Sequence, residues 1–420
     1  MPQKFQTPSG MHDLLGTRAI YFEKIYDTVV KIARFYGFDR IETPLLEDTR
    51  VFTRGVGLST DIVEKEMYNL KTKGGDNLSL RPEGTASVMR SYLEHDMYTK
   101  SQPVKLFYFG PFFRYERPQA GRYRQFWQFG LETIGKSGPG LDAQTICAVY
   151  AILSDLGVKD VVVEINNMGD AKCRGIFKGA LKKYLKKANL CSDCKKRSVK
   201  NPLRVLDCKQ CVEMKRNAPQ IIDYLCKDCR EDLKKTLELL EEVGIPYDLN
   251  PFLVRGLDYY TGNVYEFFTK GKESLALGGG GRYDGLSELL GGGEDLPATG
   301  AAIGVERVML AMKSAGVEVK REKPQIFIAH LGDLAKKKCL KIFEDFRKAG
   351  ILAHESIGRD SLKSQLNQAN KLSVKWTIII GREEAIENSV VIRDMNTGSQ
   401  DKVEIKDLVK EVKQRLKNAK

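Results

Sequence analysis

Long hydrophobic runs are absent from this 420-residue sequence. No apolar stretch approaches the roughly 20 residues that a membrane-spanning helix requires. The first residues also lack the charged start and apolar core of a secretory signal. We therefore expect a cytoplasmic protein with no membrane partner. Internal repeats and low-complexity linkers are absent too, which excludes a repeat array. Hydrophobic residues still make up 42% of the chain, enough for two or three globular domains.

Acidic residues are in deficit, with 55 Asp and Glu against 68 Lys and Arg, so the formal net charge is +13. An excess of this size fits either a polyanionic partner such as nucleic acid or a lysine-rich solvated surface. The charge is uneven, because residues 172–200 hold eleven Lys or Arg and a single acidic residue, Asp193. This segment is the best candidate for contact with a polyanion.

Seven of the nine cysteines lie between residues 173 and 229, and six of them form three Cys-x-x-Cys pairs. In a reducing compartment such pairs indicate metal binding rather than disulfides. The first two pairs suit a tetrahedral zinc site, and the third could replace either. Reduced, partly buried thiols without metal are the alternative. The pairs are Cys191 and Cys194, Cys208 and Cys211, and Cys226 and Cys229.

Composition and periodicity divide the chain into three parts. Residues 1–324 mix hairpins with helices, as α+β folds do. They are interrupted at 170–245 by a helical, basic, cysteine-rich stretch that reads as an inserted module. Residues 325–420 alternate strands and helices, which predicts a small α/β domain. Within the first part we expect strands at 41–46, broken at Pro44, and at 252–257.

Two glycine motifs do not identify a nucleotide site by themselves. Residues 130–137 match the P-loop pattern, but strand-like residues precede Lys136 and Gly-Pro-Gly follows, so no helix can start where the pattern needs one. The four glycines 278–281 do not satisfy G-x-G-x-x-G. They permit either close approach of a ligand to the backbone or tight packing between a strand and a helix.

An arginine-rich loop at 116–123 joins two aromatic strands, expected at 106–115 and 124–134. Arginines make bidentate phosphate contacts and aromatic rings stack on bases, although arginine ladders on surface hairpins are also common. The residues that carry this pattern are Arg114, Glu116, Arg117, Arg122, Arg124 and Phe126.

Residues 253–262 place Arg255 among apolar residues, where a buried charge needs an anion. The anion is either Asp258 or Glu266, as a structural ion pair, or a substrate carboxylate or phosphate. On a strand, Arg255 and Tyr259 would share one face, and Asp258 and Tyr260 the other.

Several of these segments together resemble the class II aminoacyl-tRNA synthetases. Residues 113–116 with Arg122 resemble motif 2, residues 303–307 motif 3, and residues 42–44 the weaker motif 1. Within that class, three further segments resemble the histidyl-tRNA synthetase family, over essentially the whole chain. They are 80–86 (Leu-Arg-Pro-Glu-Gly-Thr-Ala), 255–260 (Arg-Gly-Leu-Asp-Tyr-Tyr) and 280–285 (Gly-Gly-Arg-Tyr-Asp-Gly).

The resemblance implies a fold and a set of partners. The fold is an antiparallel six-stranded sheet with flanking helices, an inserted helical domain and a C-terminal α/β anticodon-binding domain. The implied substrates are L-histidine, ATP with Mg²⁺, and tRNA(His), and the implied assembly is a homodimer built partly on motif 1. We also expect a structural Zn²⁺ in the insertion. Because the family needs no zinc for catalysis, reduced thiols without metal remain the alternative.

The resemblance also assigns roles to residues. Glu83, Thr85 and Gln128 would hold the histidine α-amino group, and Glu132 with Tyr260 and the adjacent Tyr259 would bind the imidazole. Arg114 would contact the ATP α-phosphate, Phe126 the adenine and Arg307 the γ-phosphate, with Glu116 and Arg122 in the same site. Arg255 would stand where other members place a metal ion. Arg117 and Gln119 would meet the tRNA acceptor end, with the basic run 172–200 along the acceptor arm. Trp127 stands where many relatives have histidine.

Two other functions remain open. The first is a non-catalytic relative that regulates ATP phosphoribosyltransferase; it lacks the C-terminal domain and loses signature residues, whereas this chain has both. The second is a synthetase for another amino acid.

Overall fold

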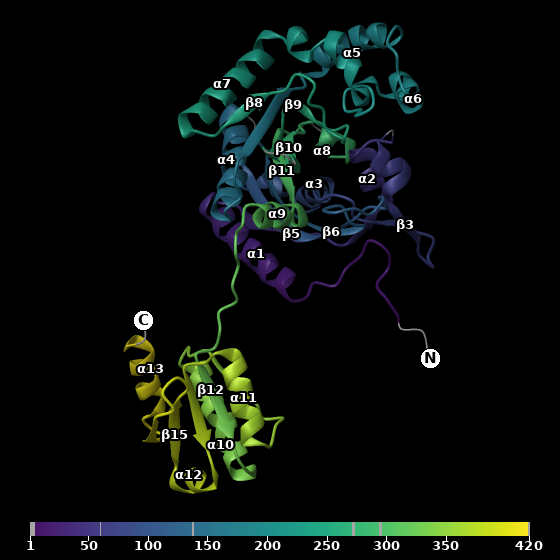
Figure 1. The fold of residues 1–420 in the computed structure, drawn as a ribbon. Coiled ribbons are helices and arrows are strands. Elements are labelled where there is room, and N and C mark those ends of the chain that lie inside the picture. Colours follow the sequence, from purple (N-terminus) through teal and green to yellow (C-terminus); the bar gives the residue numbers. More distant parts are fainter. Residues whose placement is uncertain (1–4, 59, 137, 271–273, 294–295, 419–420) are drawn as a thin grey trace. The chain divides into compact units, whose positions relative to one another are not determined.

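The computed structural model describes residues 5–58, 60–136, 138–270, 274–293 and 296–418. The chain divides into two compact units, Met1–Val319 and Lys320–Lys420 (Figure 1).

An eight-stranded sheet forms the centre of the first unit, in the order β1-β5-β6-β11-β10-β9-β7-β8. The six inner strands are antiparallel to one another. The short edge strands are parallel to their neighbours, because β1 pairs in parallel with β5 and β8 with β7. The antiparallel six-stranded sheet implied by the family resemblance is therefore present, extended by two parallel edge strands into a mixed sheet. In spatial order, the strands are β1 (Asp39–Arg40), β5 (Val104–Phe113), β6 (Gln125–Ile134), β11 (Ala298–Gly304), β10 (Leu275–Arg282), β9 (Thr261–Thr269), β7 (Val161–Asn167) and β8 (Tyr247–Leu249).

Alternation along the inner strands gives the sheet two different faces. Phe109, Phe129 and Leu131 belong to a core shared with four helices, α1 (Thr17–Phe35), α4 (Pro139–Asp155), α7 (Lys227–Val243) and α9 (Val305–Ser314). Tyr108 on β5 belongs to the other core, on the opposite face. That second core includes residues of α2 (Thr49–Gly55), α3 (Thr85–Glu94), α8 (Leu286–Leu289) and the insertion. A three-stranded sheet in the order β2-β4-β3 and two short turns of helix complete this unit: β2 (Leu46–Asp48), β4 (Asn77–Leu80), β3 (Tyr68–Lys71), η1 (Ile62–Glu66) and η2 (Met97–Thr99).

Two expected strands are wrong. In the segment predicted as a strand at 41–46, only Leu46 is extended, as the start of β2. The buried Arg81 instead holds this segment, because its Nη1 donates to the carbonyl and hydroxyl oxygens of Thr43 at 2.8 and 3.0 Å. Residues 252–257 are also irregular. Asn250 starts a turn there, since its side chain accepts from the Phe252 N–H at 3.0 Å. The strand-based alternation of Arg255, Asp258 and the tyrosines therefore does not apply.

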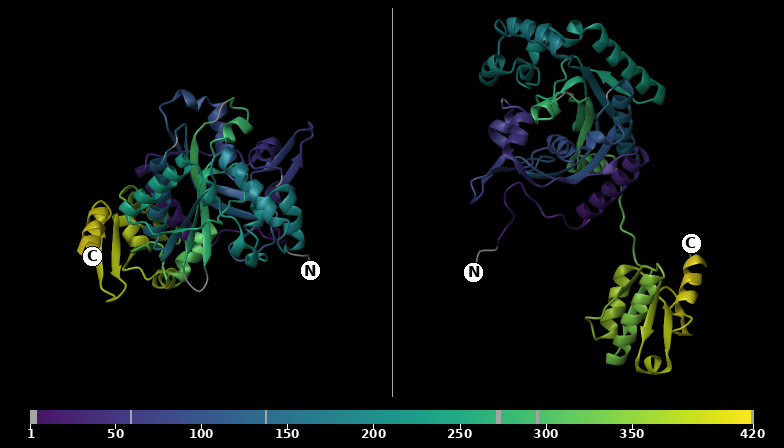
Figure 2. Two further views of the ribbon diagram at one scale, coloured as in Figure 1. Left: turned by 90° about the horizontal axis from the view of Figure 1, so that it is seen from above. Right: turned by 180° about the vertical axis from the view of Figure 1, so that it is seen from behind.

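The insertion is a group of helices, drawn in teal, beside the end of the sheet that carries β8 (Figures 1 and 2). Its helix α7 joins the first core and α5 joins the second. An ion-pair network centred on the buried Arg282 of β10 fastens the insertion. Arg282 contacts the buried Asp142 of α4 at 2.9 Å and the partly exposed Asp232 of α7 at 3.0 Å. Burial raises the pKa of Asp142 to about 6, and the adjacent guanidinium limits the rise. The insertion's elements are α5 (Ala171–Leu185), α6 (Ser192–Lys200), η3 (Pro202–Val205), η4 (Val212–Asn217), η5 (Ile221–Tyr224) and α7 (Lys227–Val243).

The second unit is an α/β domain with a five-stranded sheet in the order β13-β12-β14-β15-β16. The first three strands are parallel and the last two antiparallel. Two elements of this domain have no clear sequence signal: α12, which spans under two turns, and β16, a charged and mostly exposed edge strand. The elements are β12 (Ile326–His330), α10 (Asp333–Lys348), β13 (Ala353–Glu355), α11 (Leu362–Leu372), β14 (Trp376–Ile380), α12 (Arg382–Glu387), β15 (Ser389–Asp394), β16 (Gln400–Glu404) and α13 (Leu408–Asn418).

Among the described residues, none of the helices combines the length and the apolarity needed to cross a lipid bilayer.

Candidate functional site

The N-terminus of α3 holds a buried carboxylate. Glu83 Oε2 accepts from the backbone N–H of Thr85 at 2.7 Å, and Oε1 accepts from that of Ala86 at 2.9 Å. Burial raises the pKa of Glu83, and the two N–H donors, together with the helix dipole, oppose the rise. The hydroxyl of Tyr259 also donates to Glu83, at 3.4 Å. Two residues far apart in the sequence thus meet at one carboxylate.

Strand β6 supplies the polar floor beside this carboxylate. Its alternation places Phe126, Gln128 and Glu132 on one face, opposite to Trp127. Gln128 Oε1 is buried and has no hydrogen-bond partner among the described residues. Because buried amide oxygens are normally satisfied, this atom is positioned to accept a hydrogen bond from a bound molecule.

Glu132 is completely buried at the centre of the sheet. Thr85 Oγ1 donates to one carboxylate oxygen at 2.8 Å and the Tyr283 hydroxyl to the other at 2.6 Å. Burial raises the pKa of Glu132 to about 8, although both hydrogen bonds favour the charged form. Sequence reasoning missed the role of Tyr283, even though the residue lies in the quoted 280–285 segment.

Glycines make room for these groups by close approach. Gly300 pairs with Glu132 across β11 and β6, and a Cβ at Gly300 would lie 1.8 Å from Glu132 Oε2. In the four-glycine run of β10, a Cβ at Gly279 would lie 2.7 Å from Arg255 Nη1 and 2.4 Å from a backbone oxygen of β9. The run therefore serves packing, both against the neighbouring strand and under the Arg255 side chain.

Arg255 forms an ion pair with Glu266 of β9, with Nη1 and Oε1 separated by 3.3 Å. Asp258, the other candidate partner, accepts instead from Asn201 Nδ2 at 2.9 Å. The Nε of Arg255 is buried without a hydrogen-bond partner among the described residues. The structural ion pair is thus present, and it leaves a second donor of the guanidinium unused.

The two tyrosines lie beside this arginine. The ring centroids of Tyr259 and Tyr260 are 4.7 Å apart, and the guanidinium of Arg255 lies 5.8 Å from the Tyr260 ring. Arg174, at the start of α5, donates to the backbone oxygen of Tyr260 at 2.7 Å. The insertion therefore contacts the loop that carries the tyrosine pair.

A second arginine, Arg114, lies beside Phe126 in another part of the site. Arg114 donates through Nε to the Pro82 carbonyl at 2.9 Å, and its guanidinium lies 5.4 Å from the centroid of the Phe126 ring. Glu116 lies between two arginines, 4.0 Å from Arg114 and 3.6 Å from Arg122. An aromatic face and convergent cations suit a nucleotide with its phosphates.

Arg307 lies in the first turn of α9. Its Nη1 donates to the Ala276 carbonyl at 2.8 Å, and burial lowers its pKa. Its Nε reaches the Gly121 carbonyl in the arginine-rich loop at 3.4 Å. Arg117 and Gln119 in that loop are exposed, so they are available to a large partner.

Trp127 lies on the opposite face of β6 from these groups. Its ring packs edge-to-face on Phe22 at 4.8 Å and against Phe109 at 5.9 Å. Its backbone N–H donates to Glu306 at 3.0 Å, and burial raises the pKa of Glu306 to about 7. The side chain of Trp127 therefore has a packing role.

The structure brings together Cys191, Cys194, Cys208 and Cys211, whose sulfurs all lie within 4.8 Å of one another. Cys191 Sγ and Cys208 Sγ are 3.9 Å apart. Four thiolates about 2.3 Å from a tetrahedral zinc would be separated by about 3.8 Å. Cys226 and Cys229, the alternative pair, do not join this cluster.

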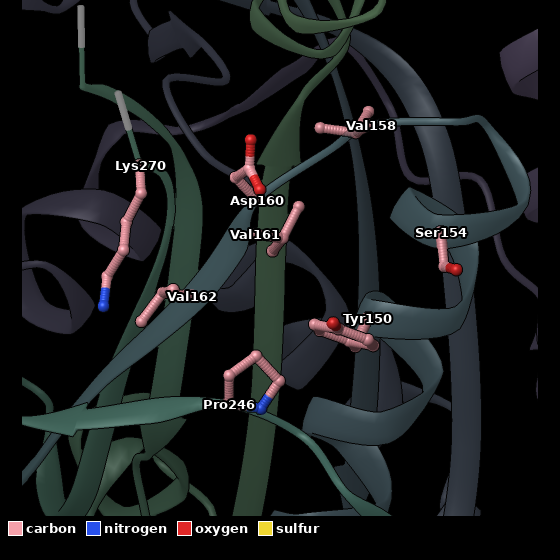
Figure 3. Close-up of a pocket in the computed structure, with 8 residues that line it drawn as sticks. All are labelled: Tyr150, Ser154, Val158, Asp160, Val161, Val162, Pro246 and Lys270. Carbon is pink, nitrogen blue, oxygen red and sulfur yellow. The ribbon is translucent and has the colours of Figure 1, made fainter. Parts of the chain in front are cut away.

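Two hollows lie near these elements. One, of about 280 Å³, connects the insertion to the tyrosine loop. Its lining is strongly basic and includes Arg174, Lys178, Lys182, Lys200, Arg204 and Arg255. The other, of about 400 Å³, lies among Tyr150, Ser154 and Lys270 (Figure 3). It contains none of the residues that the sequence singled out.

The fold and this face of the sheet define a class II aminoacyl-tRNA synthetase. Comparison with known proteins identifies the family. Residues 10–308 match the histidyl-tRNA synthetase family model and residues 325–415 that of an anticodon binding domain. The chain belongs to the histidyl-tRNA synthetase family.

Individual relatives agree over nearly their full length. A histidine--tRNA ligase of Dehalococcoides mccartyi is 43% identical, with 98% of this chain and 100% of that protein covered. A histidine--tRNA ligase of Aquifex aeolicus is 46% identical, with 96% of this chain and 99% of that protein covered. Among solved structures, apo histidyl-tRNA synthetase of S. aureus has a TM-score of 0.81 at 35% identity, covering 97% of this chain and 99% of that one.

Proposed function

We propose that this face of the sheet activates L-histidine with ATP and then transfers the histidyl group to tRNA(His). The observation that carries the proposal is the buried Gln128 Oε1, which has no hydrogen-bond partner among the described residues and lies beside carboxylates that are themselves buried. A cationic α-amino group needs a carboxylate and neutral acceptors. Glu83, Thr85 and Gln128 supply these.

The imidazole lies deeper, against Glu132 and the tyrosine pair. Glu132 is held by Thr85 and Tyr283, so its position is fixed before the substrate arrives. An amino acid without a ring N–H would leave the remaining acceptor capacity of this buried carboxyl unsatisfied, which is a strong basis for selection. Tyr260 and Tyr259 form the aromatic wall beside it.

ATP lies on the arginine side of the site. Phe126 stacks on the adenine, Arg114 contacts the α-phosphate and Arg307 the γ-phosphate. Glu116 and Arg122 complete this group, because Glu116 lies between Arg114 and Arg122. Class II synthetases use ATP with Mg²⁺, which neutralises part of the phosphate charge when bound.

The first step forms a bond between a histidine carboxylate oxygen and the α-phosphorus and breaks the α–β phosphoanhydride, releasing pyrophosphate. In the second step the tRNA 3′-terminal hydroxyl attacks the activated carbonyl, and AMP leaves. Negative charge accumulates on the α-phosphate oxygens in the first step. Arg114 and Arg255, whose Nε has no hydrogen-bond partner in the described part of the chain, stabilise it as fixed donors that need no reorganisation.

The tRNA acceptor end meets Arg117 and Gln119 at the exposed loop. The basic segment 172–200 lies along the acceptor arm and makes contact through phosphates rather than base edges. Support comes from the basic hollow that joins the insertion to Arg255 and Tyr260. Residues 325–415, the anticodon-binding match, bind the other end of the tRNA.

The four-cysteine cluster binds a structural zinc. The spacing of its sulfurs fits tetrahedral coordination, and two Cys-x-x-Cys pairs supply the four ligands. Elemental analysis of the purified protein tests this, because less than about a tenth of an equivalent of zinc would exclude it.

The protein works as a cytoplasmic homodimer built partly on residues 42–44. Leu45 and Leu46 beside that segment are exposed, each at 43%, as interface residues of a separated protomer are. Sedimentation at micromolar concentration tests the dimer, and a monomer throughout that range would contradict it.

Histidine-dependent ATP–pyrophosphate exchange tests the proposed function most simply. A panel of amino acids is offered to the full-length protein. Exchange with histidine alone is expected. No exchange with any amino acid would favour the regulatory relative, and exchange with a different one would favour another synthetase.

A further inference from the structure

A second group of potential metal ligands lies at the base of the insertion, apart from the four-cysteine cluster. Asp170, Cys173, Cys226 and Cys229 each place one ligand atom within 4.8 Å of the other three. Cys173 is buried, and Cys226 and Cys229 are partly buried. Nothing in the proposed histidine or ATP site uses these residues.

Local structure explains why the four side chains converge. Asp170 precedes α5 and Cys173 lies in its first turn, whereas Cys226 precedes α7 and Cys229 lies in its first turn. Each helix start thus contributes two ligands three positions apart, as a Cys-x-x-Cys turn does in zinc sites. The two starts lie 56 positions apart in the sequence, as Asp170 and Cys226 do.

The donor atoms have the spacing that a tetrahedral ion requires. Cys226 Sγ lies 3.7 Å from Asp170 Oδ2, and a sulfur and an oxygen bound to one zinc are separated by about 3.6 Å. Asp170 caps α5 through its other oxygen, which accepts from Cys173 N–H at 2.7 Å. One carboxylate oxygen therefore remains for a ligand while the cap stays intact.

The surroundings also suit a thiolate. The backbone N–H of Cys226 donates to Cys173 Sγ at 3.1 Å, and such contacts orient a sulfur ligand and stabilise its charge. Three thiolates and one carboxylate are a donor set suited to zinc, since soft sulfur ligands disfavour magnesium and calcium.

We propose that Asp170, Cys173, Cys226 and Cys229 form a second structural zinc site, which joins the two ends of the insertion to the catalytic unit. Asn167 at the end of β7 donates to the Cys229 carbonyl at 3.3 Å, which links the site to the central sheet. Arg174 follows Cys173 directly and contacts the Tyr260 carbonyl. Zinc here holds the start of α5 in the position from which Arg174 braces the tyrosine loop. A metal clip across so long a segment also lowers the entropy of the unfolded chain.

Zinc counting on the full-length protein tests the proposal, independently of any catalytic assay. Protein is produced with added zinc, purified under reducing conditions without chelator, and analysed by mass spectrometry for metal per chain. We expect two equivalents in the unaltered protein. One should remain after Cys173→Ser with Cys229→Ser, and one after Cys194→Ser with Cys208→Ser. Cys147→Ser, a partly buried thiol outside both clusters, should keep two.

The proposal is overturned if the Cys173→Ser, Cys229→Ser protein binds as much zinc as the unaltered protein. It is also overturned if the unaltered protein binds no zinc, or binds a single equivalent that the Cys173→Ser, Cys229→Ser protein retains. Asp170→Asn covers the case in which the double variant does not fold, because asparagine caps a helix as well as aspartate. The Asp170→Asn protein should release one of its two zinc equivalents to a colorimetric chelator at about a tenfold lower chelator concentration than the unaltered protein requires. If both zinc equivalents leave the Asp170→Asn protein at the same chelator concentration as they leave the unaltered protein, the assignment is contradicted.

Discussion

Arg255 and Glu266 form an ion pair, 3.3 Å between Nη1 and Oε1, across the unsubstituted backbone of Gly279. Glu266 pairs with Gly279 in the sheet register, and a Cβ at Gly279 would lie 2.7 Å from Arg255 Nη1. An ion pair of this kind is what a purely structural role of Arg255 would require. It uses a terminal nitrogen, however, and leaves Nε buried and unpartnered among the described residues. Glu266 thus positions Arg255 while a donor remains for a substrate anion.

Tyr283→Phe should weaken histidine binding. The hydroxyl of Tyr283 donates to Glu132 at 2.6 Å, and a hydrogen bond to a charged or chargeable group contributes about 1.5–3 kcal/mol. We expect the KM for histidine to rise by about tenfold to a hundredfold while the KM for ATP changes little. Exchange kinetics with each substrate varied in turn provides the measurement. Tyr247→Phe, which removes an exposed hydroxyl, is the control. An equal rise in both KM values would point to general damage instead.

Glu132→Gln should change the pH dependence of stability. The folded pKa of Glu132 is raised from 4.5 to about 8 by burial. Between these values the folded protein holds a proton that the unfolded chain releases, so the free energy of unfolding falls as pH rises. The contribution of this group is fully present below pH 4.5 and is lost through pH 8.

Glutamine removes that contribution. The slope of unfolding free energy against pH should become flatter by up to about 1.4 kcal/mol per pH unit. Urea denaturation at several pH values between these limits measures it, with Asp248→Asn as the exposed control. Parallel slopes in the variant and the unaltered protein would mean that Glu132 is ionised in the fold.

Arg117→Ala with Gln119→Ala should separate the two half-reactions. Both side chains are exposed on the arginine-rich loop and, in our proposal, contact tRNA alone. Pyrophosphate exchange should stay within about twofold, and tRNA charging should fall about tenfold or more. A parallel fall in both activities would place these residues in the ATP site.

Trp127→Leu should affect stability rather than chemistry. The ring packs on Phe22 and Phe109, on the face of β6 opposite to Gln128. Its loss should lower the free energy of unfolding by about 2 kcal/mol, as urea denaturation would show. Pyrophosphate exchange, measured at urea concentrations below the denaturation midpoint of the variant, should be unaffected. A hundredfold loss of kcat would instead assign Trp127 a chemical role.

The sequence predicted much of the fold because local patterns carried it. Apolar residues at helical spacing predict an amphipathic helix over residues 17–36, and the helix is present as Thr17–Phe35. The two aromatic strands also appear, as β5 and β6. The strand at 252–257 was wrong because apolar composition alone does not distinguish a buried loop from a strand. The turn begun by Asn250 decides the structure there.

The site could be predicted only where single residues carried a recognisable motif. Glu83, Arg114 and Arg255 stand in such motifs, whereas contacts between distant positions have no local signal. The Tyr283–Glu132 bond spans 151 positions. Asp170 and Cys173 form no Cys-x-x-Cys pair, so their convergence with Cys226 could be seen only in three dimensions.

Arg255→Ala provides the most direct test of the account, measured as histidine-dependent ATP–pyrophosphate exchange beside histidine binding by calorimetry. If Arg255 stabilises the charge that builds on the α-phosphate, exchange should fall by several orders of magnitude while histidine still binds. Circular dichroism and the unfolding midpoint show whether the variant remains folded. Near-normal exchange in a folded Arg255→Ala protein would contradict the account and leave Arg255 as the structural partner of Glu266 alone.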